Sequence, residues 1–262
     1  MPAAIRMQEE FGDDLAVVFV ESQGSNDVGA MNFAARQKWL GGRAMWTTEA
    51  PFDSGMNGLP SFVLLDVEGK VLLKGYSNSM HKQIEDAIQQ QVAVRRKGPK
   101  DLPAPVAKVY AELAKGNYGA AVSAADKALA QPPSKDQEAF VAAANAAREA
   151  AQAAAERASA RVDWLWQNGY PQAAQDLVAE LQGGFKGSAA LEQRAKELKA
   201  QLDAPEAQKE LGAGKSLARL EAALYKEGPG KDLGKALDEC AEKNAGTRVA
   251  ERAKRLAEVA RG

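Results

Sequence analysis

Cysteine and histidine are almost absent from this sequence, which has one of each among 262 residues. A single cysteine forms no internal disulfide, and it cannot build a cysteine-ligated zinc site. Cys240 lies on an apolar helical stripe, where we expect the thiol to pack as a small hydrophobic group. His81 has no second histidine with which to share a metal, and we expect it to face solvent. The sequence therefore predicts no metal site and no cofactor.

Long apolar runs and an excess of positive charge are absent as well. No stretch approaches 18 consecutive apolar residues, so the sequence predicts no transmembrane segment. The 34 Lys and Arg are balanced by 35 Asp and Glu, and neither half is basic enough to predict binding to nucleic acid or to an anionic membrane. The N-terminus shows neither the basic region nor the apolar region of a signal peptide.

The first 97 residues alternate predicted helices with predicted strands. Apolar positions at helical spacing predict helices at 2–11, at 27–40, closed by Gly41-Gly42, and at 79–94. Runs of β-branched and aromatic residues predict strands at 14–22, 61–66 and 70–75. The last two strands are joined by the turn "DVEG", which has glycine where a positive φ is needed.

A proline stands directly before the second of these strands, in the phrase "GLPSFVLLDVEGK" at residues 58–70. Proline cannot donate a hydrogen bond to a sheet, so its place at the mouth of a strand needs a reason. The phrase and the order helix, strand, helix, loop, proline, strand, turn, strand, helix resemble the thioredoxin fold with its first strand missing. Among thioredoxin-like proteins the resemblance is closest to thiol–disulfide oxidoreductases of the TlpA type.

The resemblance implies a peptide-docking edge at this proline. In that family the proline is cis, and an extended peptide pairs with the backbone beside it. Carried over to this sequence, Leu59, Pro60 and Ser61 form the edge, and Trp46 in the preceding loop helps to line a groove. The alternatives are a trans proline at an ordinary loop-to-strand junction and a Trp46 that anchors its loop in the core.

The catalytic cysteines of that family are missing from this sequence. The reaction needs two cysteines, two residues apart, at the N-terminus of the first helix, and the resemblance puts that pair and the missing strand upstream of Met1. We therefore expect Met1 to be an internal residue of a longer protein, and this chain to be inactive with no catalytic residue of its own. The alternative is a degenerate domain in which the strands at 14–22 and 61–66 pair directly. The resemblance suggests an extracytoplasmic location, and the compartment stays open.

The second half of the sequence predicts helices alone. Glycine and proline mark a linker at 98–105, and residues 106–262 show no strand signal. Residues 106–133 resemble a tetratricopeptide unit with a tight turn at Gly116-Asn117, and a weaker echo starts at Gly169-Tyr170. Such stacked hairpins commonly hold peptides or partner proteins, and a plain helical bundle without a ligand is the alternative.

The phrase "LGAGKS" at residues 211–216 resembles a phosphate-binding loop only in part. It lacks the first glycine of that motif and a preceding strand, so we expect Gly212 and Gly214 to break two helices instead.

Together these patterns predict an α/β thioredoxin-like domain at 1–97 and an all-α, tetratricopeptide-like domain at 106–262. The predicted function is that of a thioredoxin-family protein with a helical region that binds a protein or peptide partner. A redox-inactive interaction scaffold is the alternative.

Overall fold

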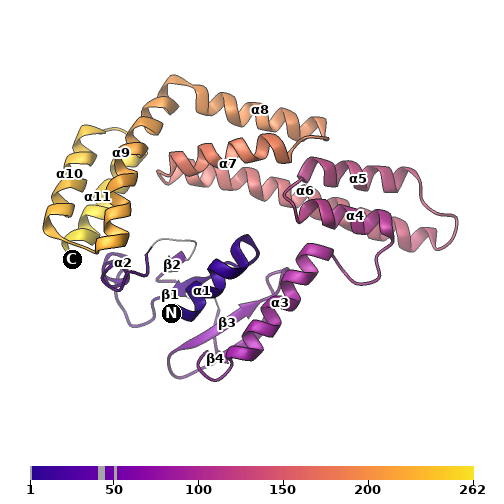
Figure 1. Ribbon diagram of the computed structural model, residues 1–262, viewed down its shortest axis with the longest axis horizontal. Coiled ribbons are helices and arrows are strands. Elements are labelled where there is room, and N and C mark those ends of the chain that lie inside the picture. The colour runs from indigo at the N-terminus through magenta and orange to yellow at the C-terminus, as the bar shows by residue number, and fades with distance from the viewer. Residues whose placement is uncertain (1, 41–44, 50–51) are drawn as a thin grey trace. The chain divides into compact units, whose positions relative to one another are not determined.

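The structure is a computed structural model that describes residues 2–40, 45–49 and 52–262 (Figure 1). Its architecture is mixed and rich in helix, with strands in the first part of the chain and helices throughout the second. The helix end predicted at Gly41-Gly42 lies outside the described residues. No described helix is both long and apolar enough to cross a bilayer.

Residues 2–97, which we call the α/β region, contain the described strands. Its elements are α1 (Pro2–Phe11), a short 3-10 turn η1 (Gly12–Asp14), β1 (Val18–Val20), α2 (Asp27–Arg36), β2 (Met45–Thr47), β3 (Ser61–Leu65), β4 (Val71–Tyr76) and α3 (His81–Lys97). This order confirms the predicted alternation of helices and strands. The strand predicted at 14–22 is shorter than expected, and β2 was not predicted.

Local side-chain hydrogen bonds fix two of these elements where the sequence predicts them. The Asn26 side chain accepts a hydrogen bond from the Gly29 N–H at 2.8 Å and so caps α2. The "DVEG" turn forms as predicted, with Gly69 at a φ of 84°. In that turn, the Asp66 carboxylate accepts hydrogen bonds from the backbone N–H groups of Glu68 and Lys70, each at 2.9 Å.

The described strands form two separate two-stranded sheets. β1 pairs with β2 in parallel, with Phe19 opposite Trp46. β3 pairs with β4 in antiparallel fashion, from Ser61 opposite Tyr76 to Leu65 opposite Val71. No ladder joins β1 to β3 in the described part of the chain. The direct pairing of these two strands, expected for a degenerate domain, is therefore not what the structure shows.

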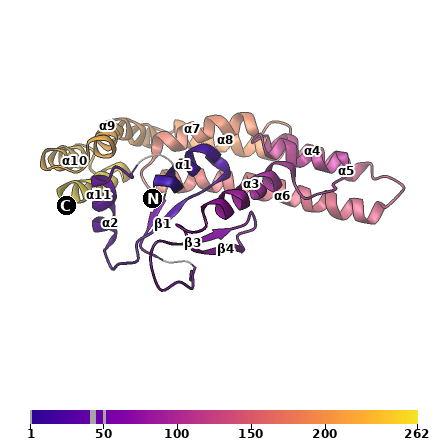
Figure 2. The ribbon, with the colours of Figure 1, turned by 60° about the horizontal axis from the view of Figure 1, so that its bottom comes forward.

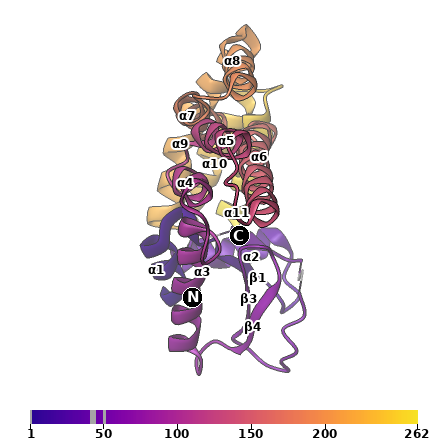
Figure 3. The ribbon, with the colours of Figure 1, turned by 90° about the vertical axis from the view of Figure 1, so that its right-hand side faces the viewer.

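Helices α1 and α3 pack on the same face of β3. Ile84, Ile88 and Val92 on α3 are buried against a half-buried set from the other elements, which comprises Met7, Phe11, Leu15, Phe62, Leu64 and Met80. Figure 3 shows α3 running beside the β3–β4 hairpin. The buried Gln8 side chain ties α1 to the chain leading into β1: its amide donates to the Leu15 carbonyl, and its oxygen accepts from the Val17 N–H.

Residues 98–262 form helices and no strand, as predicted. The helices are α4 (Ala104–Leu113), α5 (Tyr118–Ala130), α6 (Gln137–Gln167), α7 (Pro171–Gly184), α8 (Ala189–Asp203), α9 (Pro205–Glu227), α10 (Lys231–Lys243) and α11 (Arg248–Arg261). The expected helix break at Gly212 and Gly214 is wrong, because α9 continues through both residues. A Cβ at Gly214 would lie 2.1 Å from Oε1 of Gln172, so the glycine serves the close approach of α9 to α7.

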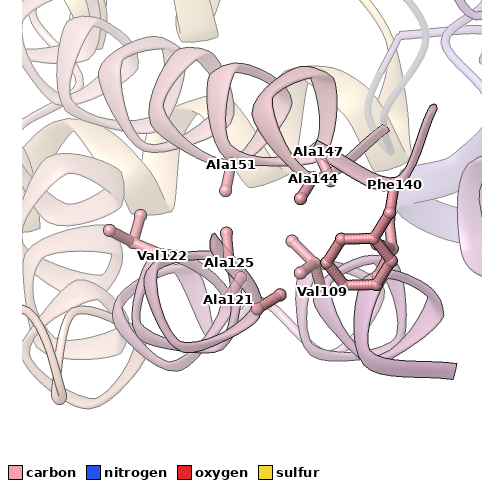
Figure 4. Close-up of a cluster of buried hydrophobic side chains, with 10 residues drawn as sticks. Val109, Ala121, Val122, Ala125, Phe140, Ala144, Ala147 and Ala151 are labelled. Carbon is pink, nitrogen blue, oxygen red and sulfur yellow. The ribbon is translucent and has the colours of Figure 1, made fainter. Parts of the chain in front are cut away.

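Helix α6 is shared by two buried clusters. Its first half carries Phe140, Ala144, Ala147 and Ala151 into a cluster with α4 and α5 (Figure 4). Its second half carries Ala155 and Val162 into a cluster with α7 and α8. Figure 2 shows α4 and α5 at one end of α6, with α7 and α8 toward the other. Alanine at most of these positions lets the helices approach closely.

The chain divides into two compact units that the sequence order does not separate cleanly. The first contains residues 1–95, 220–236 and 255–262, and the second contains residues 96–219 and 237–254. The first break falls beside the predicted linker, and α9, α10 and α11 each contribute residues to both units. The domain boundaries at 1–97 and 106–262 stay a prediction, because a compact unit is not shown to fold alone.

Candidate functional site

The predicted docking edge begins at the Leu59–Pro60 peptide bond, which is cis. The Pro60 carbonyl accepts hydrogen bonds from Ser77, at 3.1 Å from the backbone N–H and at 3.5 Å from the hydroxyl. These bonds fix the start of β3 against the end of β4. The structure thus confirms the expected cis bond and brings Leu59, Pro60 and Ser61 together at one end of the β3–β4 hairpin.

The backbone of β3 has one hydrogen-bonding edge that pairs with no strand in the described part of the chain. Peptide groups alternate in direction along a strand. The Pro60 carbonyl faces β4, as it bonds Ser77, so the N–H and C=O groups of Ser61 and Val63 face the other way. That side has no paired strand among the described residues. An extended segment laid along β3 would therefore bond first to Ser61 and Val63.

Two exposed apolar side chains lie at this end of the hairpin. Leu59 is 61% exposed and Tyr76 40%. The Tyr76 ring lies over Gly58, where an added Cβ would be 3.7 Å from the ring. Ser61 is half-buried opposite Tyr76. The edge therefore offers a mainly apolar surface beside a row of backbone groups that pair with no described strand.

Trp46, the fourth predicted site residue, is placed only in part. Its backbone lies in β2 opposite Phe19, and its side chain lies outside what the structure describes. No described contact joins it to Leu59, Pro60 or Ser61, so the role of Trp46 in lining a groove stays a prediction.

The edge carries no group that could perform thiol chemistry. Cys240, the one cysteine of the chain, is buried in α10, on the apolar stripe predicted for it. Burial raises the pKa of the Cys240 thiol above its ordinary value, and a hydrogen bond from Asn244 and the charge of Lys243 oppose that shift. A thiol held neutral in this way is a poor nucleophile. Among the described residues, no group of three or more His, Cys, Asp and Glu side chains could hold a metal.

Exposed apolar side chains are concentrated in the α/β region as a whole. Of eleven large apolar side chains that are strongly exposed among the described residues, ten belong to this region. They include Val18 and Val20 on β1, at 46% and 40% exposed, and Val71 and Leu72 on β4. Apolar side chains of both sheets are therefore left exposed to solvent in the described structure.

A second candidate surface lies where the α6–α7 turn meets the start of α11. Trp164, 55% exposed, stacks on Tyr170 with ring centroids 5.8 Å apart, and the Arg252 guanidinium lies 3.6 Å from the centroid of the Tyr170 ring. The Arg252 side chain also donates to the Gly169 carbonyl at 3.4 Å. We call Trp164, Tyr170 and Arg252 the aromatic cluster.

A pocket of about 530 Å³ borders the same turn. Trp166, Lys209, Glu210 and Arg248 are among its lining residues. The buried Glu210 carboxylate accepts hydrogen bonds from the N–H groups of Arg248, at 2.8 Å, and Val249, at 3.3 Å, and so caps α11. The Glu210 carboxylate therefore serves to stabilise the start of α11.

The two tryptophans at the end of α6 differ in exposure: Trp166 is half-buried while Trp164 is exposed. Arg252 was missed, since it lies far from Tyr170 in the sequence and no local pattern marks the pair.

Comparison with protein-family models, with curated proteins and with solved structures found no match to this chain.

Proposed function

We propose that this chain is a thioredoxin-family protein, related to thiol–disulfide oxidoreductases, whose redox-active cysteine pair is supplied by polypeptide outside residues 1–262. In this proposal a strand missing from the sheet belongs between β1 and β3. The chain at Leu59 and Pro60, directly before β3, positions an extended polypeptide substrate, and the helical region binds a partner protein.

The observation that carries the proposal is the separation of β1 from β3. Each strand is paired on one side only within the described residues, and the side chains of β1 are exposed at two of its three positions. A strand between them would bond to Ser61 and Val63 and cover exposed apolar surface. The order of helices and strands in the α/β region agrees with the same family.

The test compares this chain with the polypeptide read from the same frame with its upstream codons included. We expect an apolar strand and a Cys-x-x-Cys pair just before residue 1, and reduction of insulin by the longer chain only. Residues 1–262 alone should show no turnover, because one buried thiol cannot complete an exchange. An upstream sequence without the pair would contradict the redox assignment.

A redox-inactive interaction scaffold is the second candidate, and the aromatic cluster favours it. Trp, Tyr and Arg are the residues most enriched at the energetic centres of protein interfaces, and Trp164 is strongly exposed in the helical region. If the upstream pair is missing, partner binding should depend on this cluster or on the β3 edge.

Two single variants test the β3 edge and the aromatic cluster one at a time. Val63→Pro removes an N–H that faces away from β4, so it should abolish strand pairing at the edge and leave the hairpin intact. Trp164→Ala should weaken binding at the helical region alone. Circular dichroism of both variants serves as the folding control, and a partner that binds both variants as tightly as the parent chain would rule out the scaffold function at these surfaces.

A further inference from the structure

The last turns of α11 are buried along one side. Helix ends fray unless other elements hold them. In α11, however, the last turns are closed in, since Leu256, Ala257, Val259 and Ala260 are all at most 3% exposed. The end of α11 must therefore be covered by other parts of the molecule.

Helix α2 supplies part of that cover. Figures 1 and 3 show α2 next to the C-terminal end of the chain. A Cβ added at Gly262 would lie 3.1 Å from the Arg36 guanidinium and 3.5 Å from the Asn32 amide. Within the first compact unit, the side of α2 that carries Asn32 and Arg36 thus lies against the end of α11.

One buried hydrogen bond joins the two helices. The Asn32 side-chain amide donates to the Val259 carbonyl at 2.6 Å, and Asn32 is itself only 8% exposed. Val259 is among the last four residues of α11, whose carbonyls have no partner within the helix. Asn32 therefore caps the end of α11 from a position 227 residues away in the sequence.

The start of α11 is fixed independently. Its first N–H groups are held by the Glu210 carboxylate and by the Thr247 hydroxyl, which accepts from the Ala250 N–H at 3.0 Å. Residues 248–254 belong to the second compact unit, and residues 255–261 belong to the first. A single helix thus has one anchored end in each unit.

We propose that α11 is a strap whose C-terminal half completes the core of the α/β region through α2, so that α2 and residues 255–261 open and close as one unit. This inference does not depend on the proposed redox or scaffold function. It means that the α/β region is held in its folded form by residues 255–261.

The test is amide hydrogen exchange on the full chain carrying Asn32→Ala. Alanine is a better helix former than asparagine, so the variant does not weaken α2 directly, and it leaves the Val259 carbonyl unsatisfied. Exchange in α2 and in residues 255–261 should rise together, by about fivefold or more, while α4, α5 and α6 keep their protection. Asn145→Ala, at an exposed asparagine on α6, is the matched control and should change neither segment.

A second variant is included in case the change in hydrogen exchange caused by Asn32→Ala is too small to measure. Asn32→Glu places a charge in the buried contact, at the residue that bonds Val259, and should open the same two segments further, whereas Asn145→Glu, at the exposed asparagine on α6, should not. If Asn32→Glu fails to fold, the Asn32→Ala result decides. Faster exchange in α2 without any change in residues 255–261, or no change in either, would overturn the strap.

Discussion

At the scale of single residues, two glycines with the same backbone conformation have different reasons to be there. Gly116 and Gly169 both end a helix with positive φ, at 74° and 75°. Nothing lies within 4 Å of a Cβ built on Gly116, whereas a Cβ on Gly169 would lie 2.9 Å from the Arg248 carbonyl oxygen. Gly116 is needed for its conformation, and Gly169 is needed for its conformation and for close contact with α11.

The two alanine substitutions should therefore differ in cost. Gly116→Ala should lower the free energy of unfolding by about 1 kcal/mol, the cost of a left-handed conformation for a residue with a Cβ. Gly169→Ala should lower it by about 1 to 3 kcal/mol more, because α11 must move away from the turn. Urea unfolding of both variants measures the difference, and equal losses would contradict the close contact.

The buried thiol gives a second residue-scale prediction. Because burial raises the pKa of Cys240, the folded chain holds this proton to a higher pH than the unfolded chain does. The stability linked to the neutral thiol is present below the unfolded-state pKa of about 8.5 and is lost as the pH rises above it. Between pH 8 and 10, stability should fall more steeply in the parent chain than in Cys240→Ala.

At the scale of elements, helix α11 depends on a carboxylate from another helix. Glu210 on α9 caps its first two N–H groups. Glu210→Ala removes both hydrogen bonds and should lower the free energy of unfolding by about 1 to 3 kcal/mol. Glu210→Gln keeps one acceptor oxygen and should cost less. Thermal unfolding compares them with Glu206→Gln, an exposed control one turn earlier, which should have almost no effect.

Helix type and approximate position were predictable from the sequence, because apolar spacing and capping residues act locally. The helices predicted at 2–11 and 79–94 are α1 and α3. Two predictions failed for different reasons. Gly214, which lies where α9 closely approaches α7, was misread as a helix break, and β2 was missed because its three residues carry too short a pattern to recognise.

The same distinction applies to the candidate site. The cis bond at Pro60 was predictable from a phrase of consecutive residues that resembles a known family. The aromatic cluster and the strap were not, since Arg252 and Val259 meet their partners across long stretches of sequence. A contact of that kind leaves no periodic signal in a single sequence.

At the scale of the whole molecule, stability should be unevenly distributed. The α/β region contains nearly all of the strongly exposed apolar side chains that are described, and its α1–β3–α3 cluster has only three buried members. The clusters on α6 are larger and contain many fully buried residues. Local opening is cheapest where few apolar contacts are lost.

Hydrogen exchange should show this difference directly. Amides in β3 and β4 should exchange at least about tenfold faster than those in the middle of α6, under conditions where the chain is folded. The measurement needs no ligand and no variant. Equal protection in both segments would mean that the α/β region is better covered than its exposed side chains indicate.

The sharing of α6 has a consequence for spacing. A continuous helix of 31 residues is about 46 Å long, and it bends little unless a proline or an inserted side chain disrupts it. The hairpin of α4 and α5 and the hairpin of α7 and α8 both pack on this one continuous helix. Any two molecules bound to these hairpins would therefore be held at a fixed distance from each other.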